Sequence, residues 1–144
     1  MRDEGLRLYL NEIGKHKQNY KFELDELHHD LLASQLTSRD YRAAERLLQV
    51  FTELCIGLSK HWVKQIQGHS SSDAYQAFVI LKEHGKIDSE RLSTWKKIIG
   101  MRNGLVHDYL NIDLLIIEKV IKEQHYLELE AFSTLAIQTL EQEY

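Results

Sequence analysis

Proline is absent from this chain, and glycine occurs only seven times in 144 residues. These two residues interrupt helices most strongly, proline through its missing N–H and glycine through its backbone entropy. Good helix formers such as Leu, Glu, Lys and Gln are plentiful. The sequence therefore predicts an all-α fold, and its length favours one domain, residues 1–144, that buries its own core.

Cysteine and long apolar runs are scarce as well. The single cysteine, Cys55, has no partner for an internal disulfide and lies among apolar residues, so we expect a buried thiol. No segment is long and apolar enough to cross a membrane, and residues 1–5 lack the apolar run of a signal peptide. We therefore expect a soluble cytoplasmic protein with no membrane partner.

Positive charge is also in short supply, because the formal net charge is −4. The chain as a whole does not attract nucleic acid. A contact with RNA must therefore come from a local basic patch. The segment 91–102 offers one, with Arg91, Lys96, Lys97 and Arg102.

Apolar residues recur every three to four positions, the period of an amphipathic helix. Residues 6–31 predict one long helix or a broken pair. Thr37 or Ser38 caps a second helix, whose apolar stripe between 47 and 66 is the clearest in the chain. A loop at 68–72 leads into a short third helix, which Gly85 ends.

Two more helices are predicted in the second half of the chain. Asp88 or Ser89 begins a fourth helix that Asn111 stops, and Asp113 caps a fifth that extends almost to the C-terminus. The fifth carries two apolar stripes, one at 116, 120, 127, 131 and 135 and one at 117, 121, 129, 132, 136 and 140. Either one stripe faces the bundle and the other a second subunit or partner, or both form one wide buried face.

The candidate catalytic side chains lie within eight residues, 102–109, with the sequence RNGLVHDY. Arg102 supplies a planar cation suited to phosphate, and His107 a proton donor and acceptor that works near neutral pH. Tyr109 supplies a hydroxyl that can be bonded or modified. Side chains of this kind can cleave a phosphodiester without a metal, although an arginine and a histidine at a helix end also merely complement the helix dipole.

Helix geometry constrains how this site is assembled. Residues five apart point about 140° from each other, so Arg102 faces the side of Trp95 and Ile99, and His107 faces away. Either the helix unwinds at Gly104, or a symmetric dimer completes the site. Asn103, four residues before His107, is placed to hydrogen-bond the imidazole.

The motif and its surroundings resemble the HepT-like branch of the HEPN superfamily. That branch carries Arg-x-x-x-x-His-x-Tyr behind a lysine-lysine-hydrophobic-x-Gly lead-in, matched here by residues 96–109. The stretch 74–88 and the acidic Glu53 also resemble family positions, and the likeness covers about residues 42 to 140. Gly57 departs from it, because family members often carry a polar residue there.

The resemblance implies an up-and-down bundle of four to five helices that dimerises around the motif helix. It also implies an endoribonuclease toxin that needs neither metal nor cofactor and leaves a 2′,3′-cyclic phosphate. Arg102 would hold the scissile phosphate, His107 would be the general base or acid, and Asn103 would orient one of them. Glu53 either reaches the cleft or is a solvent-exposed carboxylate, and Lys96 and Lys97 would support RNA binding.

The resemblance also implies a partner and a means of control. Family toxins of this type VII-like pair are neutralised by a minimal nucleotidyltransferase antitoxin, which transfers AMP from ATP to the tyrosine at the position of Tyr109. Two further interpretations stay open. The chain is alternatively a non-catalytic substrate-binding subunit of a two-component nucleotidyltransferase, or a helical dimer in which the motif is only structural.

Overall fold

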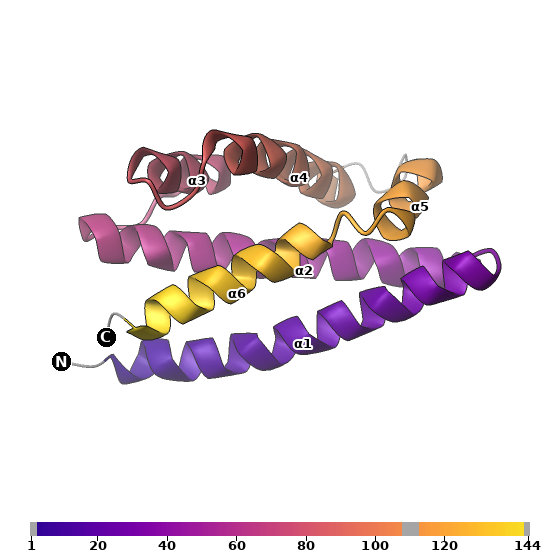
Figure 1. Cartoon of the computed structure of the whole chain (residues 1–144), viewed down its shortest axis with the longest axis horizontal. Coiled ribbons are helices and arrows are strands. Elements are labelled where there is room, and N and C mark those ends of the chain that lie inside the picture. Colours follow the sequence, from indigo (N-terminus) through magenta and orange to yellow (C-terminus); the bar gives the residue numbers. More distant parts are fainter. Residues whose placement is uncertain (1–2, 108–112, 143–144) are drawn as a thin grey trace.

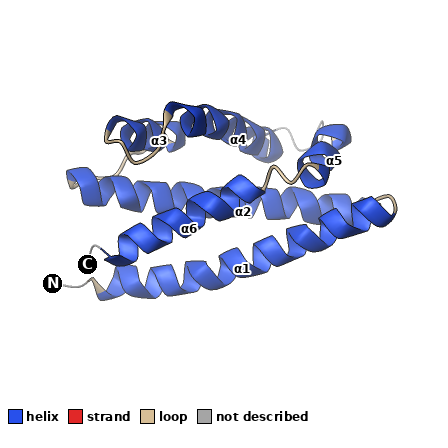
Figure 2. Cartoon of the chain, in the orientation of Figure 1, coloured by secondary structure: helices blue, strands red, loops and turns tan. Residues whose placement is uncertain are grey.

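The computed structural model describes residues 3–107 and 113–142, and at position 107 the backbone alone. Within these ranges the chain forms six helices and no strand (Figure 2). No helix in them is long and apolar enough to span a membrane. The helices are α1 (Glu4–Ala33), α2 (Ser38–Gln67), α3 (Ala74–Glu83), α4 (Ser89–His107), α5 (Leu114–Lys122) and α6 (Leu127–Gln142).

The helix boundaries follow local capping chemistry. The Thr37 hydroxyl accepts from the N–H of Asp40 and the Asp40 carboxylate accepts from the N–H of Thr37, which closes a capping box at the start of α2. Gly68, with φ of 88°, ends α2, and Gly85, with φ of 73°, follows α3. These boundaries confirm those predicted for the second and third helices, and α1 is one helix rather than a broken pair.

Helix α2 is the centre of the bundle. It packs against every other helix, with α3 and α4 along one side and α1 along the other, while α6 lies over it between them (Figure 1). Its buried face contributes Phe51 and Trp62 to the core. Cys55 is fully buried, as predicted, and burial raises the pKa of its thiol well above the usual value.

The prediction of a single fifth helix was wrong, because this part of the chain forms two helices, α5 and α6. Asp113 does cap α5, but the chain turns after Lys122, where Gln124 has a φ of 55°. Two contacts hold this turn against α1: the hydroxyl of Tyr126 donates to Asp25 at 2.7 Å, and a ring nitrogen of His28 lies 2.9 Å from the carbonyl of Ile121.

The two predicted apolar stripes differ in burial. The stripe that begins at Ile117 is buried along its whole length and faces the bundle. The other stripe is more open, with Ile116 52% and Leu127 41% exposed. The stripes therefore do not form one wide buried face.

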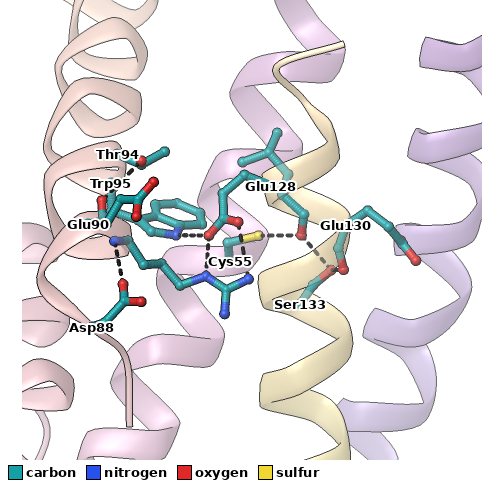
Figure 3. Close-up of polar contacts among 10 residues, drawn as sticks. Cys55, Asp88, Glu90, Thr94, Trp95, Glu128, Glu130 and Ser133 are labelled. Atoms are coloured by element: carbon teal, nitrogen blue, oxygen red, sulfur yellow. Dashed lines mark hydrogen bonds and ion pairs between the residues drawn. The ribbon is translucent and has the colours of Figure 1, made fainter. Parts of the chain in front are cut away.

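A polar cluster fixes the first half of α4 to α6 (Figure 3). The carboxylate of Glu128 accepts from the indole N–H of Trp95 at 2.7 Å and from Arg91 at 2.7 and 3.1 Å. Beside it, Cys55 and Ser133 both donate to the carbonyl of Leu129. Trp95 also stacks on Phe78 with ring centroids 4.4 Å apart, so α4 is held firmly where it enters the motif.

Candidate active site

The motif helix is unbroken at Gly104. Helix α4 continues through it to His107, so the first of the two assembly routes, unwinding at this glycine, does not occur. On a continuous helix Arg102 and His107 point about 140° apart. Positions 102 and 107 of one chain therefore lie on different sides of α4.

Arg102 occupies the setting that the helical period predicts for it. Trp95 and Ile99 on the same side of α4 are buried, while Lys96, Gly100 and Asn103 on the other side are exposed. Arg102 itself is half-buried, and its Nε is inaccessible to solvent and makes no hydrogen bond within the described residues. Buried polar atoms normally have a partner, so this Nε is a donor that no described residue uses.

A cavity of about 620 Å³ opens in front of Arg102. Its walls come from the middle of α2, the first residues of α3 with the loop before them, and α4. The lining residues are Glu53, Ile56, Gly57, Lys60, Ser72, Asp73, Ala74, Tyr75, Ile99, Arg102 and Asn103. The cavity thus gathers three of the predicted site residues, namely Arg102, Asn103 and Glu53.

Glu53 is both exposed to solvent and part of the cavity wall. Its carboxylate accepts from the side-chain amide of Gln49 at 3.4 Å. Within the described residues it forms no salt bridge with Arg102. The two opposite charges are therefore neighbours in one cavity rather than partners.

Two further residues of this cavity, Lys60 and Tyr75, were not predicted as site residues from the sequence. Lys60 lies seven residues after Glu53, on the same face of α2, and its ammonium donates to the carbonyl of Ser72 at 3.3 Å. Tyr75 is half-buried at the start of α3. The seven-residue spacing was a usable signal for Lys60, whereas only the packing of α3 against α2 brings Tyr75 to this cavity.

The basic residues of α4 do not form one patch. Arg91 is paired with Glu128, and that bond raises the pKa of its guanidinium. Lys96 is exposed and is not among the residues of the Arg102 cavity. Lys97 lines another cavity, of about 420 Å³, between α4 and α5. The structure therefore brings neither lysine together with Arg102.

Gly57 shapes the wall of the cavity. A Cβ atom at this position would lie 3.0 Å from the hydroxyl of Tyr9, so the glycine lets the α1 side chain approach α2 closely. Tyr9 is held there by His61, with ring centroids 4.4 Å apart. Burial raises the pKa of the Tyr9 hydroxyl. In this chain, the space that a larger residue 57 would need is thus taken by the hydroxyl of Tyr9 from α1.

The remaining predicted site residues fall at the edge of what the structure describes. His107 is the last residue of α4, and its side chain is not described. Tyr109 and the predicted helix stop at Asn111 lie outside the described residues.

The sequence model of the HepT-like family, described as ribonuclease HepT-like, matches residues 14–135. The chain belongs to this family. The match includes the whole motif 102–109 and every helix that lines the Arg102 cavity. The family predicted from the motif is therefore confirmed.

Two nucleases of the family are similar to the chain in sequence. The mRNA nuclease HepT of Shewanella oneidensis is 33% identical over 81 residues, which are 56% of this chain and 59% of that protein. The tRNA nuclease HepT of Aphanizomenon flos-aquae is 32% identical over 69 residues, 48% of this chain and 47% of that protein. The chain thus spans about half the length of these relatives.

Solved structures share the HEPN fold of this HepT-like chain. One is a tri-AMPylated HEPN toxin of Shewanella oneidensis in complex with MNT antitoxin, with a TM-score of 0.74 and 24% identity over 94% of this chain and 97% of that one. Another is a toxin–antitoxin crystal structure with AMP-PNP, with a TM-score of 0.72 and 23% identity over 86% and 96% of the two chains. The predicted fold class is confirmed by these likenesses.

Proposed function

We propose that this HepT-like chain is an endoribonuclease toxin that cleaves RNA without a metal or cofactor. The observation that carries the proposal is the half-buried guanidinium of Arg102, which lines a cavity and whose Nε has no partner within the described residues. The names of the two similar nucleases support RNA as the substrate class. The proposed place of action is the cytoplasm, where such RNA is found.

The roles in this reaction follow from the chemistry of the groups. Arg102 binds the scissile phosphate and stabilises the charge that develops on it, because a fixed cation in a partly desolvated site acts without reorganisation. His107 accepts the proton of the ribose 2′-hydroxyl or protonates the leaving oxygen. The 2′-oxygen attacks phosphorus, the leaving 5′-oxygen departs, and a 2′,3′-cyclic phosphate results. Asn103, beside Arg102 in the cavity wall, orients the phosphate.

A second subunit completes the site in this proposal. The continuity of α4 supports it, because positions 102 and 107 of one helix lie on different sides of that helix. In a symmetric dimer around α4, Arg102 of one protomer meets His107 of its partner. The proposed domain, residues 1–144, is then one half of the functional unit.

The proposed control is modification of Tyr109 with AMP by a nucleotidyltransferase antitoxin. The solved complex of the tri-AMPylated HEPN toxin of Shewanella oneidensis with MNT antitoxin supports such a partner. An adenylate two residues from His107 adds bulk and negative charge, which repel an RNA phosphate.

The central test is cleavage of labelled RNA in the presence of EDTA by the wild type and by Arg102→Ala and His107→Ala, with Lys82→Ala as an exposed control on α3. Only the wild type and the control are expected to cleave. Equal cleavage by all four proteins would reject the assignment. No cleavage by any, with retained binding of the nucleotidyltransferase, would favour the substrate-binding subunit instead.

Mixing the two inactive variants tests the shared site directly. Random assortment makes half of the dimers mixed, and each mixed dimer has one intact site of two, so about a quarter of the wild-type activity should return. If each site were contained in one chain, mixing the two variants would restore no cleavage activity. Mass spectrometry after incubation with the nucleotidyltransferase and ATP tests Tyr109, since Tyr109→Phe should gain no AMP.

A further inference from the structure

The solvent-facing side of α2 carries a row of cations. Positions 39, 42, 46, 53, 57, 60 and 64 fall within about 60° of one another on a helix with 3.6 residues per turn. Five of these seven are basic, namely Arg39, Arg42, Arg46, Lys60 and Lys64. All five are exposed except Lys60, which is half-buried. We call this row the α2 stripe.

Charge is segregated around the α2 stripe, although the chain as a whole is acidic. Asp40 and Glu45 of the same helix lie about 90° or more from its centre, and Asp40 is engaged in the capping box. Glu53 is the one acidic residue on it. Within the described residues none of the five cations forms a salt bridge, whereas Lys17 pairs with Glu130 and Lys21 with Asp25.

The α2 stripe passes through the Arg102 cavity. Gly57 and Lys60 are part of that cavity, and Arg39–Arg46 lie on one side of it along α2. On the other side Lys64 lines a cavity of about 520 Å³ together with Tyr9 and His61, whose rings pack against each other at a tilt. From Arg39 to Lys64 the helix rises about 38 Å, at about 1.5 Å per residue.

We propose that a single RNA strand lies along the α2 stripe, with the Arg102 cavity at the scissile phosphate. The inference rests on the proposed function and names the surface that holds the flanking nucleotides. Cations in one row, none of them in a salt bridge within the described residues, match a phosphate backbone. The half-buried side chains of Tyr75 and Tyr9 line the two cavities beside the row. Continuity with the cavity favours RNA over an acidic protein as the occupant.

The test measures binding of 2′-O-methyl RNA, which lacks the attacking hydroxyl and is not cleaved. The variant Arg42→Gln with Arg46→Gln removes two cations of the α2 stripe. A matched control, Lys82→Gln with Lys122→Gln, removes the same charge from exposed positions on α3 and α5. Circular dichroism confirms that each variant is folded.

For a 20-nucleotide strand, the stripe variant should bind about tenfold more weakly at 0.1 M salt. The slope of log affinity against log salt concentration (the salt slope) should become shallower by about 1.4, or about 0.7 per lost phosphate contact. A dinucleotide reaches the cavity alone, so its affinity should be unchanged. The control should match the wild type for both ligands.

The outcomes separate this inference from the proposed function. Suppose that the wild type cleaves RNA but the stripe variant keeps the wild-type affinity and salt slope. This result would overturn the proposal that RNA lies along the α2 stripe and would leave the proposed function standing. Weaker capture of the nucleotidyltransferase with unchanged RNA affinity would also overturn it and assign the stripe to the protein partner. A wild type that cleaves no RNA would remove the proposed function, yet the binding comparison would still decide whether this surface holds a strand.

Discussion

Arg102 and Glu53 line the same cavity from two helices, α4 and α2, but no salt bridge joins them within the described residues. The Glu53 carboxylate accepts a hydrogen bond from Gln49 instead, and no described residue bonds the Nε of Arg102. An arginine neutralised by its own protein must give up that pair before it holds a phosphate. Without a salt bridge to Glu53, the Arg102 cation stays available for an incoming anion.

The carboxylate of Glu53, which forms no salt bridge within the described residues, should oppose RNA binding. Glu53→Gln removes a negative charge from the cavity and is expected to tighten binding of 2′-O-methyl RNA about 1.4- to 5-fold, corresponding to about 0.2–1 kcal/mol for an exposed charge pair. Fluorescence anisotropy measures the change. Glu83→Gln, exposed on α3, is the control and should leave the affinity unchanged. Weaker binding by Glu53→Gln would instead show that the carboxylate helps to hold the ligand.

The Glu128 carboxylate should be a main anchor of the motif helix. Its side chain is 20% exposed and accepts hydrogen bonds from both Arg91 and Trp95. Glu128→Gln replaces these charge-assisted bonds with weaker ones and leaves Arg91 without its counter-charge, so the free energy of unfolding should fall by about 1.5–3 kcal/mol. Urea denaturation measures it, with Glu83→Gln expected to change by less than about 0.5 kcal/mol. Equal losses for both variants would deny the cluster an anchoring role.

The hydrogen bond from Tyr126 to Asp25 predicts a pH dependence of stability. Burial and this bond raise the pKa of Tyr126 to about 12. Because the folded pKa lies above the unfolded value of about 10, the hydroxyl's contribution is complete below pH 10 and is lost as the pH rises to about 12. Tyr126→Phe should therefore be about 1 kcal/mol less stable at pH 7, and its deficit should shrink between pH 10 and 12.

Tyr20→Phe is the matched control for this pH series, because the Tyr20 hydroxyl makes no hydrogen bond within the described residues. Urea denaturation at pH 7, 9, 10, 11 and 12 compares the three proteins. A deficit for Tyr126→Phe that stays constant to pH 12 would contradict the linkage.

Local chemistry made much of the fold predictable. The caps at Thr37, Gly68 and Asp113 are short-range features, and the apolar period placed Arg102 on the inner side of α4. The roles of Arg102, His107, Asn103 and Tyr109 stay predictions. The place of Tyr75 in the cavity wall was harder to predict. It depends on how the start of α3 packs against α2, and no periodicity within α3 indicates it.

The break between α5 and α6 was not predictable from the usual signals. Neither glycine nor proline marks it, and Gln124 takes the left-handed conformation that glycine adopts without cost. Tertiary contacts on both sides explain the turn: Tyr126 is fixed to Asp25 and the carbonyl of Ile121 to His28. The strain at Gln124 is thus sustained by the packing of α1 against the turn.

Relieving that strain should stabilise the protein. Gln124→Gly removes the Cβ clash of a left-handed residue and should raise the free energy of unfolding by about 1 kcal/mol, despite the loss of the 3.4 Å bond from Gln124 to the Tyr126 hydroxyl. Gln124→Ala loses the same bond but keeps the Cβ, so it should be no more stable than the wild type. Thermal and urea unfolding of the three proteins measure the difference. If alanine stabilised as much as glycine, the backbone at this turn would not be strained, and the break would have to arise from the contacts with α1 alone.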